Sequence, residues 1–108
     1  MDKKNLNCIP CNEACSHKPY NEFEDTVHLM LSDDYRDRFV SEYRQVKIRY
    51  ERLKAFNNRI EAAMMAPASN VKEPKHDCPL GLLRAQQKAM GEYLHTLELR
   101  AVIEHIDL

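Results

Sequence analysis

The sequence contains little glycine and no tryptophan. Its 108 residues include two glycines and no tryptophan, whereas 31% are Asp, Glu, Lys or Arg. A sheet protein of this size needs many turns, and tight turns rely on glycine. The composition therefore predicts a single small all-α domain, built from long helices around a thin apolar core.

Long apolar runs are also absent. No stretch approaches the roughly 18 apolar residues of a membrane-spanning helix, and the start, MDKKNLNCIPC, lacks the apolar run of a signal peptide. We therefore expect a cytosolic protein without a membrane partner. Thiols stay reduced in that compartment, so the four cysteines are not expected to form two structural disulfides.

Motifs for catalysis and for general nucleic-acid binding are missing. The chain has no glycine-rich phosphate loop and no His-Glu-x-x-His motif. Cys78 stands near His76, but no orienting third group or oxyanion donor accompanies that thiol. The net charge of −1 argues against a general nucleic-acid binder, which needs a basic excess. We therefore predict a protein that is not an enzyme.

Two amphipathic patterns organise most of the chain. In each, seam residues recur at alternating steps of three and four, the spacing of a coiled coil. Pro67 ends the first pattern, a polar loop follows, and Pro79 suits the first turn of the second. The sequence therefore predicts an antiparallel two-helix coiled-coil hairpin over residues 32–108, with helices at about 33–66 and 79–106. The first seam comprises Phe39, Tyr43, Val46, Tyr50, Leu53, Asn57, Ile60 and Met64, and the second Leu80, Leu83, Gln87, Met90, Leu94, Leu97 and Ala101.

Local signals refine the start and the register of the hairpin. Ser32 can cap the first helix, with two aspartates behind it at the positive end of the helix dipole. Asn57 and Gln87 are the polar exceptions in the two seams and fall at the same level when the helices fold back. A facing pair would fix the register. The alternative is that both amides lie at the edge of the seam and meet water.

Residues 1–31 form a separate N-terminal arm. It is irregular and rich in cysteine, and residues 22–31 favour a short helix over a strand. Three thiols and an imidazole could fill a tetrahedral zinc shell, although the usual zinc folds pair two knuckles over a longer span. The alternative is a tail with incidental cysteines, so zinc is a candidate cofactor only. The candidate ligands are Cys8, Cys11, Cys15 and His17.

Tyrosines alternate with basic residues on the first predicted helix. Aromatic rings stack on bases and guanidinium groups bind phosphates, so this mixture suits a phosphorylated ligand. Equally, basic residues beside a seam commonly keep a coiled coil soluble. The candidate ligand-binding residues are Tyr35, Arg36, Arg38, Arg44 and Lys47; comparable groups on the second predicted helix are Arg84, Lys88, Tyr93, His95 and Arg100.

The hairpin also carries apolar residues outside its seams. A second stripe in a chain this small is typical of an oligomer contact, although the N-terminal segment could cover it instead. We expect a homo-oligomer. The residues are Val40, Ile48, Ala55 and Ala62 on the first helix, and Leu82, Ala85, Ala89, Leu99, Val102, Ile103 and Ile106 on the second.

Two stretches carry a resemblance to a known family. They are Ser32 to Ala63, with its opening Asp-Tyr-Arg-x-Arg-Phe, and CPLGLLRAQQKAMGEYLHTLELRAVIE at 78–104. Together they resemble a family of small bacteriophage and prophage proteins, named after an uncharacterised product of a crAss-like gut phage. The cysteine-rich arm departs from that pattern.

The resemblance implies a helical phage accessory protein that acts in the host cytoplasm without established catalysis. Small phage hairpins of similar design include oligomeric sponges for the nucleotide messengers of bacterial immunity. Our leading hypothesis is a counter-defence protein that sequesters a cyclic nucleotide or related messenger. The alternative is an interaction module that inhibits or redirects a host protein, through an arm ordered by zinc. A virion component is a third interpretation, which only the coiled coil favours.

Overall fold

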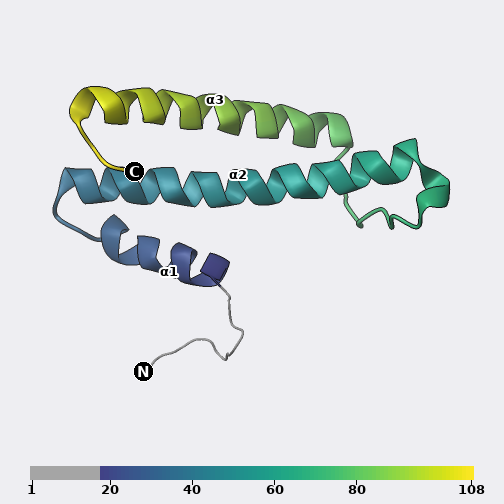
Figure 1. Cartoon of the computed structure of the whole chain (residues 1–108), viewed down its shortest axis with the longest axis horizontal. Helices are drawn as coiled ribbons and strands as arrows, with labels where there is room; N and C mark the ends of the chain where they lie inside the picture. Colours follow the sequence, from purple (N-terminus) through teal and green to yellow (C-terminus); the bar gives the residue numbers. More distant parts are fainter. Residues whose placement is uncertain (1–17) are drawn as a thin grey trace. The chain divides into compact units, whose positions relative to one another are not determined.

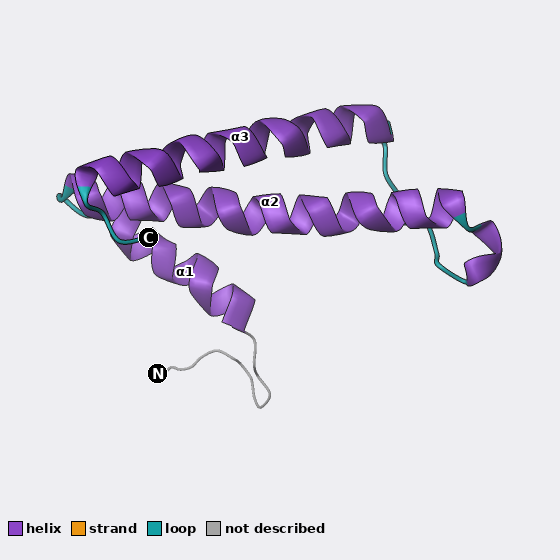
Figure 2. Cartoon of the chain, turned by 45° about the horizontal axis from the view of Figure 1, so that its top comes forward, coloured by secondary structure: helices purple, strands orange, loops and turns teal. Residues whose placement is uncertain are grey.

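The computed structural model describes residues 18–108, with side chains from residue 23 onward. Its helices are α1 (Lys18–Met30), α2 (Tyr35–Met65) and α3 (Leu80–Glu104), with the short 3-10 helix η1 (Pro67–Ser69) after α2 (Figure 1). The described residues contain no strand, which confirms the all-α class (Figure 2). None of the described helices is long and apolar enough to span a membrane.

The described chain divides into two compact units, with the boundary inside α2 between Gln45 and Val46. In the first unit, α1 contacts the first part of α2 through polar groups. Thr26 is fully buried; its carbonyl accepts a hydrogen bond from Ser41 Oγ at 2.8 Å, and its hydroxyl accepts one from Gln45 Nε2 at 2.9 Å. Because these buried groups are paired, their burial costs little. The segment in which the sequence favours a helix over a strand lies largely in α1.

The start of α2 differs from the expected cap. Asp34, not Ser32, caps the helix, since its Oδ1 accepts the Arg36 backbone N–H at 3.0 Å. Ser32 supports the preceding turn: its Oγ accepts the Asp34 N–H at 3.0 Å and donates to Asp37 Oδ2 at 2.8 Å. The reason is geometric, because the helix begins at Tyr35 and its capping position is the residue before it.

In the second unit, residues 46–107, the rest of α2 lies beside α3 (Figures 1 and 2). Asn57 is fully buried, and its Nδ2 donates to Gln87 Oε1 at 3.1 Å and to the Leu83 carbonyl at 3.2 Å. Glu61 pairs with Arg84 one turn further along α2. The contacts therefore run in opposite directions along the two helices. The facing Asn57–Gln87 pair is confirmed, and the alternative that Asn57 meets water is wrong.

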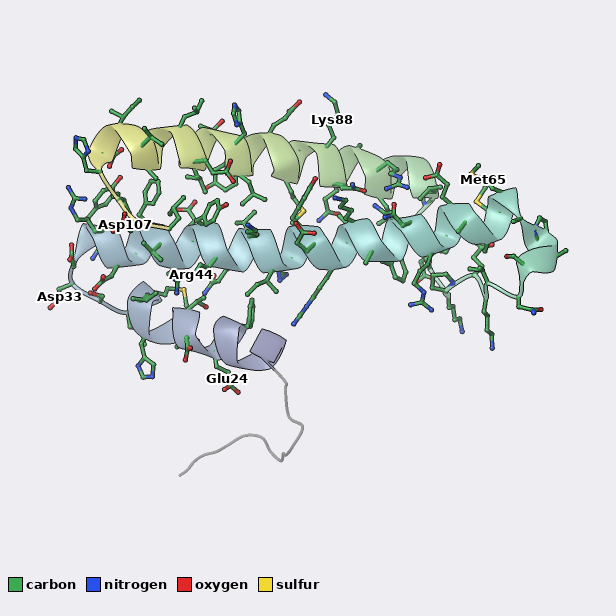
Figure 3. The ribbon with its side chains drawn as sticks, in the orientation of Figure 1. Glu24, Asp33, Arg44, Met65, Lys88 and Asp107 are labelled. Atoms are coloured by element: carbon green, nitrogen blue, oxygen red, sulfur yellow. The ribbon has the colours of Figure 1, made fainter. Side chains whose placement is uncertain are left out.

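Burial follows the predicted seams with one exception. Ile60, Leu94 and Leu97 are buried in the second unit, whereas Met64 is 59% exposed. The last turn of α2 extends beyond the first turn of α3 in both ribbon views, so α3 does not cover it (Figures 1 and 2). Figure 3 places the neighbouring Met65 at this end of α2.

The C-terminal end of α3 turns back on itself. His105 adopts a left-handed conformation with φ of 58°, and the Ile106 N–H donates to the Ala101 carbonyl at 2.9 Å. This is the hydrogen-bond pattern of a Schellman cap. Ile106 is only 8% exposed as a result, so the expectation that it is a spare apolar residue is wrong.

Replacing Asn57 by alanine should lower the free energy of unfolding by about 1–3 kcal/mol, because two hydrogen bonds in a buried seam are lost. Urea denaturation followed by circular dichroism measures this change. Lys54→Ala, at an exposed position of the same helix, is the matched control and should have little effect. Equal stabilities of the two variants would show that the amide pair does not stabilise the seam.

Candidate functional site

The second unit carries a groove of about 750 Å³ along α2 and α3. Its α3 residues recur at steps of three and four, so they share one helix face. Figure 3 shows the labelled Lys88 side chain leaving α3 on the side away from α2. The lining residues are Tyr50, Arg84, Gln87, Lys88, Gly91, Glu92, His95 and Thr96.

Gly91 makes room for the aromatic wall of this groove. A Cβ atom at Gly91 would lie 3.3 Å from Tyr50 Cε1 and 3.5 Å from the Tyr50 hydroxyl oxygen. Glycine inside a helix costs about 1 kcal/mol relative to alanine. The close approach of the Tyr50 ring to the α3 backbone is the packing reason for bearing that cost at this position.

Arg84 is held by several partners. Its Nη1 donates to Gln87 Oε1 at 2.7 Å, and its Nη2 donates to Asn58 Oδ1 at 3.1 Å and pairs with Glu61. Gln87 Oε1 also accepts from Asn57. The guanidinium is therefore part of the same network that sets the register of the two helices.

Lys88 differs from Arg84 in its freedom to change partners. It pairs with Glu92 at 2.9 Å, one turn along α3, and both side chains are more than two-thirds exposed. An exposed pair of this kind contributes only about 0.3–0.5 kcal/mol, so Lys88 can turn towards a phosphate at small cost. Together, the ring and the two cations could stack on a planar group and bind an anion.

The residues predicted from the first helix are not gathered into one cluster. Tyr35 is 46% exposed, its ring lies edge-on to Phe39 at 6.0 Å, and Arg38 is exposed three residues later. Tyr35 and Arg38 share a face because residues three apart on a helix are neighbours. Arg36 is exposed next to Tyr35 but does not share that face, and Arg44, nine residues beyond Tyr35, leaves α2 on the opposite side.

The remaining predicted residues lie elsewhere. Lys47 is exposed and belongs to the second compact unit. The candidate zinc ligands Cys8, Cys11, Cys15 and His17 lie outside the described residues. Among residues that are described, no group of three or more His, Cys, Asp or Glu side chains could hold a metal ion.

Sequence reasoning named Arg84, Lys88 and His95 but did not assemble them into a groove. It assigned Tyr50 to the apolar seam and attached no role to Gly91. The available signal was a glycine inside a helical pattern, flanked on the same face by basic residues three and seven positions away.

A family model described as Sequestin matches residues 33–103, which is more than half of the chain. The chain belongs to the Sequestin family. The matched region contains the whole groove and the five candidate residues of α2. The family name is consistent with a sequestering role and indicates a binding protein rather than an enzyme. No curated protein and no solved structure matches.

A double-mutant cycle tests the contact between Tyr50 and Gly91. In a Tyr50→Ala background, Gly91→Ala should raise the free energy of unfolding by about 1 kcal/mol through helix propensity. With Tyr50 present the gain should be smaller, because the new methyl group displaces the ring. Gly81→Ala is the control, since nothing lies within 4 Å of a Cβ there. An equal Gly91→Ala gain in both backgrounds would show that the ring does not need this glycine.

Proposed function

We propose that this Sequestin-family protein binds and sequesters a cyclic nucleotide or a related immune messenger. In this proposal it is a non-enzymatic phage counter-defence protein that acts in the host cytoplasm. The observation that carries the proposal is the groove in the family-matched region, which is lined by an aromatic ring and two cations. Sequestration requires binding alone, which agrees with the family name.

The groove supplies the two interactions that nucleotides require. In this proposal a base stacks on the Tyr50 ring, which lies close to α3 at Gly91, an interaction worth about 1–3 kcal/mol. Lys88 can exchange its exposed carboxylate partner for a phosphate, and Arg84 adds a second, fixed positive charge. Glu92 opposes an anion at the rim, so the ligand must displace this carboxylate from Lys88.

The first turn of α2 is a second candidate position for the ligand. Tyr35 and Arg38 lie on one exposed face there, with Arg36 adjacent in the sequence. The sequence prediction includes Arg44 and Lys47 in the same site. We retain Tyr35, Arg36 and Arg38 as the core of this second proposal, because an exposed ring and a guanidinium on one helix face can stack on a base and bind a phosphate.

We also propose that residues 32–108 form an antiparallel coiled-coil hairpin that assembles into homo-oligomers. Leu99, Val102 and Ile103 on α3 are 53–75% exposed, and a second copy of the chain could bury them. The same residues could bind a host protein, which is the alternative function. In that alternative, zinc bound by the N-terminal cysteines orders the partner-binding arm.

Calorimetric titration with cyclic dinucleotides locates the site. If the ligand occupies the groove, Lys88→Ala should weaken binding about tenfold, the effect of losing roughly 1.4 kcal/mol. Lys72→Ala, an exposed lysine of the same unit, is the control and should bind as the wild type does. If the ligand occupies the first turn of α2, the combined Tyr35→Ala and Arg36→Ala variant should lose binding instead. Unchanged binding by both variants would contradict both positions.

Native mass spectrometry of the purified protein distinguishes the two functions. We expect an oligomer that takes up stoichiometric cyclic dinucleotide, and Ile103→Asp should dissociate it by placing a charge in an apolar contact. A bound zinc ion would appear as a mass increment. Removal of residues 1–21 should spare nucleotide uptake if the helices hold the site. A monomer that ignores every nucleotide would favour the host-protein alternative.

A further inference from the structure

Residues 70–79 connect η1 to α3 without a regular helix or strand. Three prolines stand in the connection from α2 to α3, and these three residues have no backbone N–H to donate. His76 is its best-anchored side chain. The imidazole is partly buried, with a side-chain exposure of 19%.

Both ring nitrogens of His76 face hydrogen-bond acceptors. Nδ1 lies 2.7 Å from the Cys78 carbonyl oxygen, and Nε2 lies 3.0 Å from Glu73 Oε2. Carbonyl and carboxylate oxygens only accept, so each contact needs an N–H on the ring. A neutral imidazole has one N–H and an imidazolium has two. The geometry is therefore satisfied in full only by the protonated ring.

The same ring connects the loop to α2. Its centroid lies 6.4 Å from that of Phe56, and the two planes are nearly perpendicular at 89°, an edge-to-face arrangement that aromatic rings favour. Across the described residues, no other side chain of 70–79 makes a hydrogen bond, ion pair or ring contact with α2. His76 therefore makes the one ring contact between this loop and α2 among the described residues.

We propose that protonated His76 is a pH-dependent latch that holds loop 70–79 against Phe56 of α2. When the ring loses one proton, one of its two acceptors loses its hydrogen bond. The ring is then free to rotate to the remaining acceptor, and its contact with Phe56 weakens. The loop consequently opens more often, while α2 and α3 remain paired through Asn57 and Gln87.

The groups around His76 determine how the latch responds to pH. The Cys78 carbonyl and then the Glu73 carboxylate raise the pKa of His76 above its ordinary value of 6.5, and Asp77 adds to this, while burial opposes it. Phe56, the residue packed against the ring from α2, does not titrate. A raised folded-state pKa stabilises the folded protein fully below the unfolded pKa, and this stabilisation is lost as pH rises through the folded pKa.

Nitrogen-15 NMR of the histidine rings tests the latch. We expect both His76 nitrogens in the imidazolium form at pH 6, and a titration midpoint above about 6.5. Glu73→Gln keeps a hydrogen-bond acceptor but removes the charge, so it should lower that midpoint. A midpoint at or below 6.5 in the wild type would overturn the proposal.

Amide hydrogen exchange tests the consequence. After correction for intrinsic exchange rates, opening of residues 71–77 in the wild type should increase as pH rises through the His76 midpoint. The glutamine side chain of His76→Gln does not titrate, so in this variant the loop should open to the same extent at every pH. His95→Gln, at an exposed position of α3, is the control and should retain the wild-type step. Loop exchange that is identical in wild type and His76→Gln at all pH values would refute the latch.

Discussion

The hydrogen bond between Asn57 and Gln87 is the interaction on which the second unit depends. Both amides stand in otherwise apolar seams, and Asn57 has no exposed surface. Sliding one helix along the other would leave the buried Asn57 Nδ2 donor unpaired, at a cost of about 1–3 kcal/mol. Purely apolar seams tolerate such slips more readily. The amide pair therefore selects a single register, and that register places Tyr50 against Gly91.

The two basic residues of the groove have different roles. Arg84 joins Gln87 to Asn58 and Glu61, so it belongs to the framework that holds the helices together. Lys88 lies one turn further along the same face and is held only by an exposed partner. One cation is thus preorganised and the other can move. A preorganised charge can orient an anion without a further loss of side-chain freedom.

The connection from α2 to α3 is attached to α2 by a different kind of contact. Proline restricts its backbone. One histidine is oriented by two charge-assisted contacts within the loop, and its ring contacts Phe56 of α2. The amide pair is indifferent to pH near neutrality, whereas the histidine contacts require a proton. The unit therefore combines a permanent attachment between its helices with a conditional one at its loop.

The sequence by itself determined the all-α class, most of the buried seam and the Asn57–Gln87 pair, because these depend on helical periodicity, which is a local property of the chain. Only the tertiary structure decided which seam residues are covered. Met64 is exposed because α2 extends past the start of α3. The tertiary structure also decided that Tyr50 lines a groove. Gly91 has no side chain, so space is left beside it, and the pairing of the two helices determines that the Tyr50 ring occupies this space. No periodicity in a single helix contains that information.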